Sequence, residues 1–146
     1  MTILEKTFRF EAAHRLVKGY CGKCASNHGH SWNGRVIVGY LTDELNQYGM
    51  LVDYSVLKEV ITPMVEQLDH STLVWEGDNT FVDFLQGQGN KITKFSDNPT
   101  SEVVAQHLFK VWRADFAAKG LILHEVVLEE TCTTRCRVTE KNQVCN

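Results

Sequence analysis

Along residues 2–16, apolar side chains tend to alternate with polar ones, which restricts the folds open to this chain. Phe8, Phe10, Ala12 and His14 share one phase of the alternation, whereas the other phase includes threonine, arginine and glutamate. A period of two residues is that of a β-strand with one buried face. We therefore expect a strand over this segment, with His14 close to its end and on its apolar face.

A second alternating segment covers residues 31–41 and predicts another strand. His28 and His30 stand just before it, two residues apart, so that on an extended chain both imidazoles point to the same face. His14 joins them if the two strands lie side by side. Three histidines of this kind can bind a zinc ion and leave a fourth position open for water or substrate.

A thiol accompanies this histidine group, because Cys24 precedes His28 by four residues. It could act as a reactive sulfur beside the metal. An alternative is a closed structural knuckle, in which Cys21 and Cys24 bind zinc together with His28 and His30. The knuckle leaves His14 unexplained.

Two further alternatives also remain open. Cys132 and Cys136 could complete a four-cysteine zinc ribbon with Cys21 and Cys24, although this ribbon leaves all three histidines unexplained. The histidines could also be unrelated core residues. Without a ribbon, Cys132, Cys136 and Cys145 are interpreted as incidental thiols.

Two helices are expected. Residues 55–68 carry an apolar stripe at helical spacing, with Asp53 or Ser55 as the cap, and Pro63 should kink this helix or split off its last turn. The second helix starts at Pro99-Thr-Ser-Glu102 and ends at Lys119-Gly120.

The remaining segments complete an α+β domain. Residues 121–130 and 136–144 predict two more strands, and residues 76–98 form a long polar excursion that could include a short hairpin. The expected fold is a single domain over residues 1–146, with two helices on one face of an antiparallel four-stranded sheet. No further element is left to cover the other face, which indicates self-association.

Composition excludes several classes of protein. The net charge is −3 and no basic run is present, which argues against a nucleic-acid partner. No signal-peptide core and no apolar run long enough to span a membrane is found, so we expect no membrane association. Five cysteines, an odd number, fit a reducing compartment, and we expect a cytoplasmic protein.

Two acidic segments could contribute to a site. Asp69-His70 follows the first helix and offers an acid/base group with a carboxylate beside it, although such a pair is also common where helices end. Glu129 and Glu130 end the third strand. Both phases of that strand carry apolar residues, so the alternation does not decide which glutamate faces the core.

Taken together, these segments resemble the family of 6-pyruvoyltetrahydropterin and 6-carboxytetrahydropterin synthases. The resemblance covers roughly residues 5–138, and the short spacing before the histidine pair is similar to that of the bacterial 6-carboxytetrahydropterin synthases of queuosine and 7-deazapurine biosynthesis. It departs from them in the length of the 76–98 excursion and in the second thiol, Cys21. The motifs that carry it are Phe10-Glu-Ala-Ala-His14, Cys24-x3-His28-Gly-His30, Gly49-Met-Leu-Val-Asp53-Tyr, Leu68-Asp-His70, Pro99-Thr-Ser-Glu102 and Glu130-Thr131.

The resemblance implies a tunnelling fold (T-fold), in which sheets of several subunits form an oligomeric barrel with active sites at the subunit interfaces. It also implies a lyase that converts 7,8-dihydroneopterin triphosphate to 6-carboxytetrahydropterin, acetaldehyde and triphosphate. The alternative outcome is elimination of triphosphate to give 6-pyruvoyltetrahydropterin. A non-catalytic zinc-knuckle binding module is the more distant alternative.

The resemblance further implies roles for individual residues. His14, His28 and His30 would bind Zn²⁺, Cys24 would accept a proton, and His70 with Asp69 would relay protons. Glu130 would hold the pterin edge through paired hydrogen bonds and take part in the relay. Further pterin contacts are expected from Thr100, Glu102 and Thr131.

Overall fold

The computed structural model describes residues 2–140, and its centre is one six-stranded sheet in the order β4-β3-β1-β2-β5-β6. Four strands form an antiparallel group: β1 (Ile3–His14), β2 (His28–Gly39), β5 (Ile122–Thr131) and β6 (Thr134–Thr139). Beside β1 lie two parallel strands, β3 (Ser71–Trp75) and β4 (Ile92–Phe95). The expected α+β class is confirmed.

The sheet is larger than expected and mixed rather than antiparallel. Residues 71–75 leave α1 (Tyr54–Leu68) and pair in parallel with the end of β1. Such a short strand has too few residues to show a clear period, and only its neighbours define it. Of the predicted final strand, the part beyond residue 140 lies outside the described residues.

A short hairpin was one possibility for residues 76–98, and the structure has none there. This segment instead forms α2 (Asn79–Gly87) followed by β4. Val82 and Leu85 pack against Val74 of β3 in a small separate cluster. Phe84 between these two positions is apolar but exposed, and it obscures the helical spacing in the sequence.

Two helices cover one face of the sheet, as predicted. α1 begins after Asp53, whose carboxylate accepts a hydrogen bond from the Ser55 N–H at 2.7 Å. α1 is not divided at Pro63. Pro63 and Glu59, whose carbonyl loses its helical partner, are both exposed, so water can solvate that carbonyl.

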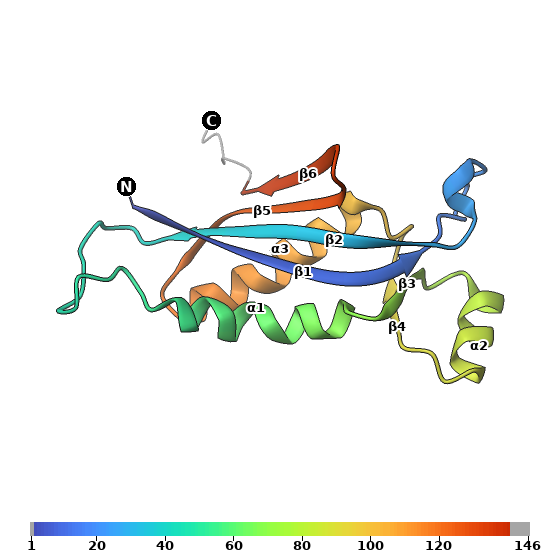
Figure 1. Cartoon of the computed structure of the whole chain (residues 1–146), viewed down its shortest axis with the longest axis horizontal. Helices are drawn as coiled ribbons and strands as arrows, with labels where there is room; N and C mark the ends of the chain where they lie inside the picture. The colour runs from blue at the N-terminus through green and yellow to red at the C-terminus, as the bar shows by residue number, and fades with distance from the viewer. Residues whose placement is uncertain (1, 141–146) are drawn as a thin grey trace, which may run out of the picture.

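The second of these helices, α3 (Ser101–Ala118), begins after Thr100, whose hydroxyl accepts from the Val103 N–H. Figure 1 shows α1 and α3 beneath the sheet and α2 beyond its end. None of the helices within residues 2–140 combines the length and apolar character needed to cross a bilayer.

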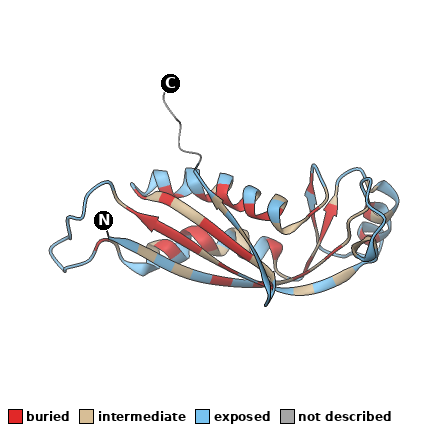
Figure 2. Cartoon of the chain, turned by 90° about the horizontal axis from the view of Figure 1, so that it is seen from above, coloured by how far each residue is buried: buried red, intermediate tan, exposed pale blue. Residues whose placement is uncertain are grey.

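The core lies between the sheet and these two helices (Figure 2). Phe8, Phe10 and Trp32 are buried there, and the Phe8 ring occupies the space above Gly34, which lies opposite it on β2. His14 continues this row of buried side chains, so the core packing places it.

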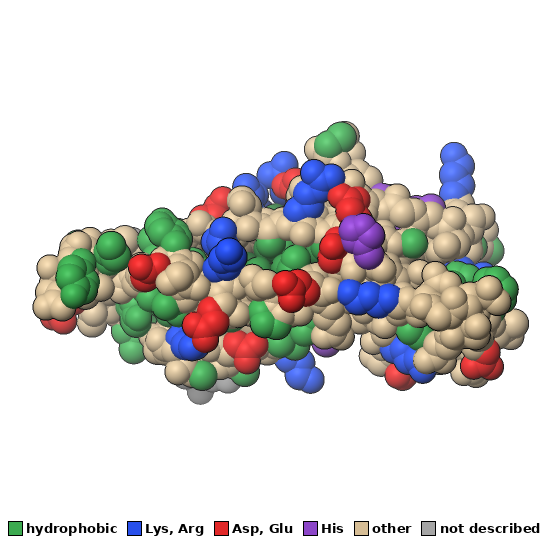
Figure 3. Space-filling view, turned by 60° about the horizontal axis from the view of Figure 1, so that its bottom comes forward, with side chains coloured by type: hydrophobic (Ala, Val, Ile, Leu, Met, Phe, Trp, Pro, Cys, Tyr) green, Lys and Arg blue, Asp and Glu red, His purple; other side chains and the backbone are tan. Residues whose placement is uncertain are grey.

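The face of the sheet away from the helices is mainly polar around the middle of β1 and β2. Its exposed or half-buried residues there are Thr7, Arg9, Glu11, Ser31, Asn33 and Arg35. This part of the face is therefore not the apolar patch that was expected, and self-association stays a prediction. Basic and acidic side chains are also interspersed on the face shown in Figure 3.

Candidate metal centre and surrounding site

The antiparallel pairing of β1 and β2 brings the three histidines together. His14 lies directly opposite His28, and His30 lies opposite Ala12, one step along the same face. The ligand atoms of the three rings all lie within 4.8 Å of one another. The predicted convergence of His14, His28 and His30 on one point is thus present in the structure.

Backbone carbonyls orient two of these rings. Nδ1 of His14 lies 2.7 Å from the Pro99 carbonyl oxygen, and Nδ1 of His28 lies 2.7 Å from that of Ser26. A carbonyl can only accept, so each Nδ1 carries a proton, and in the neutral form of each ring the lone pair is on Nε2. Neutral imidazoles held in this way are prepared to bind a metal through Nε2.

The nitrogen atoms at the centre of the cluster crowd one another. Nε2 of His14 lies 3.2 Å from Nε2 of His28, and in the neutral rings described above their two lone pairs face and repel each other. Nε2 of His30 is buried and has no hydrogen-bond partner among the described residues. A divalent cation between the rings would satisfy all three atoms, so this donor set fits a metal.

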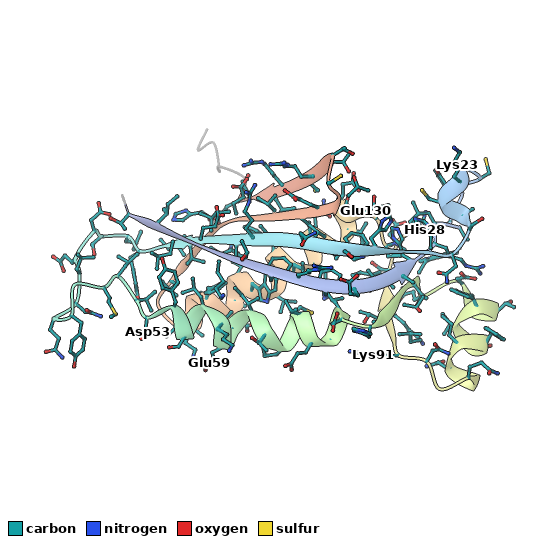
Figure 4. The ribbon with its side chains drawn as sticks, viewed as in Figure 1. Lys23, His28, Asp53, Glu59, Lys91 and Glu130 are labelled. Atoms are coloured by element: carbon teal, nitrogen blue, oxygen red, sulfur yellow. The ribbon has the colours of Figure 1, made fainter. Side chains whose placement is uncertain are left out.

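Glu130 faces this cluster from β5. Its Oε1 lies 3.0 Å from Nε2 of His14 and 3.6 Å from Nε2 of His30. The hydrogen bond with His14 holds the pKa of Glu130 below its usual value despite partial burial. Burial lowers the pKa of His30. Figure 4 shows Glu130 and His28 at the same end of the sheet.

Glu129 does not reach the cluster. Its carboxylate lies 3.4 Å from Arg135, and Glu129 pairs with Asn33 on the polar side of the sheet. The structure therefore decides between the two glutamates, which the alternation left open.

Cys24 lies in a 3₁₀ turn, Lys23–Ala25 (η1), within the loop that joins β1 to β2. It is half-buried, and its carbonyl accepts a hydrogen bond of 2.8 Å from the Leu16 N–H. Cys21 is exposed. Figure 4 shows Lys23 in this loop at the same end of the sheet as His28.

The four cysteines within residues 2–140 do not assemble a zinc site of their own, and Cys145 lies outside the described residues. Among residues 2–140, the only group of three or more possible ligands is the histidine cluster, and it includes no cysteine. Cys132 and Cys136 are free thiols of the segment that contains β6. This geometry disfavours both the closed knuckle and the four-cysteine ribbon.

Asp69 and His70 lie beside β1, where the backbone of Glu11 holds Asp69 in place. Asp69 accepts a hydrogen bond from the Glu11 N–H at 2.8 Å, and its second oxygen lies 2.8 Å from Nδ1 of His70. The Glu11 N–H, more than the His70 ring, lowers the pKa of Asp69. His70 has φ +55°, a strained value for a residue other than glycine, which is often found at functional sites.

The His70 side chain is 79 % exposed and its ion pair is with Asp69, not with the metal ligands. A cleft of about 430 Å³ nevertheless includes both His70 and His30 in its lining, together with Lys91. The structure therefore brings His70 of this pair to a cleft that it shares with His30, but not into contact with the cluster.

The three other predicted pterin contacts have local roles. The Thr100 hydroxyl caps α3, and the Thr131 hydroxyl lies within hydrogen-bond distance of two neighbouring threonines. Glu102 is exposed and accepts from Ser101.

Sequence reasoning missed the carbonyls of Pro99 and Ser26. Backbone groups leave no signal in residue type, so only the fold could reveal them.

The fold and the cluster together define a mixed α+β domain with a three-histidine site able to hold a metal at the end of two paired strands. The family model for 6-pyruvoyl tetrahydropterin synthase matches residues 3–141. The chain belongs to this family of pterin synthases.

Curated relatives share much of the sequence. A 6-carboxy-5,6,7,8-tetrahydropterin synthase from Synechocystis is 37 % identical over 143 residues, covering 94 % of this chain and 92 % of the relative. One from Aquifex aeolicus is 29 % identical, with coverage of 94 % and 98 %.

Solved structures share the fold. An uncharacterised protein from Wolinella succinogenes matches with a TM-score of 0.75 at 21 % identity, covering 96 % of this chain and 98 % of that chain. The 6-pyruvoyl tetrahydropterin synthase of Caenorhabditis elegans matches with a TM-score of 0.69 at 24 % identity, covering 96 % of each chain. These neighbours confirm the T-fold expectation for the fold of the single chain.

Proposed function

We propose that this chain is a 6-carboxy-5,6,7,8-tetrahydropterin synthase, which converts 7,8-dihydroneopterin triphosphate and water to 6-carboxytetrahydropterin, acetaldehyde and triphosphate. The observation that carries the proposal is the convergence of three Nε2 atoms and the Glu130 carboxylate at one end of the sheet. Relatives that carry this name, such as the one from Synechocystis, support the choice of reaction.

The metal is proposed to be Zn²⁺, held by Nε2 of His14, His28 and His30. Nitrogen donors suit zinc, and three protein ligands leave one position open. When bound, the ion would supply Lewis acidity toward the substrate side-chain oxygens. His14 is fully buried against Trp32, whose ring meets it edge-on at a centroid distance of 5.2 Å, so the ligand has little freedom to turn away.

The remaining chemistry falls to protein side chains. Cys24 would take the proton from the substrate carbon next to the polarised oxygen. His70, with Asp69 fixed in turn by the Glu11 backbone, would donate or relay protons during carbon–carbon cleavage. Glu130 would accept paired hydrogen bonds from the pterin ring, and its lowered pKa keeps it an acceptor at neutral pH. Thr100, Glu102 and Thr131 are proposed as outer contacts of the same pocket.

A homo-oligomer with active sites at subunit interfaces is proposed as the working form, in the cytoplasm and without a nucleic-acid or membrane partner. The exposed His70 ring is consistent with a site completed by a second subunit. An apolar segment that could contribute to contacts between copies includes the exposed Leu41, Tyr48 and Tyr54. Hydrophobic side chains gather at that end of the molecule in Figure 3.

The test is incubation of zinc-loaded protein with 7,8-dihydroneopterin triphosphate, followed by identification of the products. Acetaldehyde together with 6-carboxytetrahydropterin supports the proposal. Triphosphate with 6-pyruvoyltetrahydropterin and no acetaldehyde would instead identify the alternative activity of the same family. No product at all from zinc-loaded protein would contradict both.

A further inference from the structure

We infer that Asn98 is a positioning residue that holds the Cys24 loop against the metal site. This inference rests on the proposed function, because it assigns Asn98 a role toward the thiol and the metal of that reaction. Three hydrogen bonds join Asn98 to a segment about eighty residues earlier in the chain.

The Asn98 side chain clamps the start of the loop. Its Oδ1 accepts hydrogen bonds from the N–H groups of Val17 and Lys18, each at 2.9 Å. Its Nδ2 donates to the Lys18 carbonyl at 3.0 Å. Both lone pairs of the amide oxygen are used, so the amide is fixed in one orientation.

This clamp is the link between the loop backbone and the rest of the molecule. Among the described residues, Asn98 is the only hydrogen-bond partner outside the loop for the backbone of residues 16–25. The other backbone bonds there are internal, including the one from Leu16 N–H to the Cys24 carbonyl. The position of Cys24 therefore depends on residues 16–18, which Asn98 holds.

The neighbouring residue orients a metal ligand. Pro99 accepts the hydrogen bond from Nδ1 of His14, and Thr100 caps the 18-residue helix α3. The backbone of Asn98 is itself fixed by hydrogen bonds to the Asp97 carboxylate and from the Thr100 N–H, each 2.8 Å long. Two adjacent residues on a rigid support thus set the thiol loop and the metal ligand relative to each other.

Loss of this amide should loosen the loop without unfolding the domain. Lys18 is exposed and Val17 is half-buried, so water can replace the lost hydrogen bonds. A catalytic group misplaced by about 1 Å can cost about 100-fold in rate. We therefore expect Asn98→Ala to lower kcat by about tenfold or more, with KM changed by less than about threefold.

The decisive readout does not require turnover. The rate of Cys24 alkylation by iodoacetamide is measured at fixed pH with and without zinc, and the modified cysteine is identified by peptide mass spectrometry. In the wild type, zinc should change this rate because the proposed function has the Cys24 thiol act beside the metal. In Asn98→Ala, the effect of zinc should shrink by about threefold or more, while bound zinc remains stoichiometric.

Lys18→Ala is the matched control. It removes the exposed ion pair between Lys18 and Asp97 (3.4 Å) but keeps the backbone groups that Asn98 binds, so both kcat and the zinc effect should stay within twofold of the wild type. Asn98→Asp is the conservative variant. It keeps the two accepted hydrogen bonds and loses the donated one, so its values should lie between those of the wild type and Asn98→Ala.

The inference is overturned if folded Asn98→Ala shows the wild-type zinc effect and the wild-type kcat. It is also overturned if Asn98→Ala loses its zinc, since Asn98 would then act through the metal ligands. If Asn98→Ala does not fold, wild-type values in Asn98→Asp overturn it equally. If zinc does not change the alkylation rate of Cys24 in the wild type, the proposed function is contradicted instead. Failure of the inference and failure of the proposed function are thus distinguishable.

Discussion

The Pro99 carbonyl oxygen lies 2.7 Å from Nδ1 of His14, although 85 residues separate them in the chain. One residue ends β1 and the other precedes α3, so the packing of α3 on the sheet decides which nitrogen of His14 is free. The ligand chemistry of the cluster is in this sense a product of the tertiary fold rather than of the β1–β2 pair alone.

Removal of a metal ligand should abolish zinc binding. His14→Ala is expected to contain well under one zinc per chain after dialysis, because only two imidazoles remain. His70→Ala is the control, since His70 contacts Asp69 rather than the cluster, and it should keep its zinc while it loses turnover. Metal analysis by mass spectrometry measures both, and retained zinc in His14→Ala would exclude the three-histidine site.

Removal of the Cys24 thiol should stop the reaction without disturbing the metal. Cys24→Ala is expected to lower turnover by at least about 100-fold, while zinc content and the circular dichroism spectrum stay unchanged. Cys21→Ala, in the same loop but exposed, should remain active. Loss of zinc in Cys24→Ala would indicate that this thiol is a ligand and would support the closed structural knuckle.

The two neighbouring glutamates should differ in pterin binding. Glu130→Gln is expected to weaken binding of a pterin by about tenfold or more, because a charged acceptor of two hydrogen bonds is lost. Glu129→Gln should change it little, since that carboxylate faces Arg135 on the other side of the sheet. Calorimetric titration with a dihydropterin compares the affinities of the two variants. Equal losses of affinity would contradict the assignment of Glu130.

Acid should remove a stabilising contribution of Asp69. Its folded pKa lies below the unfolded value of about 4, so its ionisation stabilises the fold above that pH, and this contribution is lost as the pH falls through the lower folded value. Asp69→Asn should therefore have a lower Tm than the wild type at pH 7, with a smaller difference at pH 3. Asp83→Asn, exposed on α2, is the control. A difference in Tm that grows toward low pH would contradict this account.

The contact between Phe8 and Gly34 predicts that alanine substitutions at two glycines of β2 differ in their effect on stability. A Cβ on Gly34 would lie 2.2 Å from the Phe8 ring, so Gly34→Ala should cost about 1–3 kcal/mol in the free energy of unfolding. Gly29→Ala meets only the Ala12 carbonyl at 3.9 Å and should be close to neutral. Urea unfolding of both variants measures the difference, and equal stabilities would show that the ring moves aside freely.

The sequence was most informative in segments long enough to repeat the period of a strand or a helix several times. The alternation in β1 and the helical stripe of α1 predicted those elements and placed His14 on the apolar face. The short parallel strands escaped prediction, because four or five residues do not establish a period and their pairing depends on distant segments. The choice of Glu130 over Glu129 needed the register of β5 against β2.

The separate cluster of Val74, Val82 and Leu85 gives α2 an apolar anchorage of its own, outside the main core. Residues inserted or removed after Asp78 would thus strain neither α1 nor α3, whereas Asp78 itself binds the Arg15 guanidinium at 2.8 Å, next to His14. The length of α2 can therefore change beyond Asp78 without disturbing the metal ligands, as long as the contact beside His14 is kept.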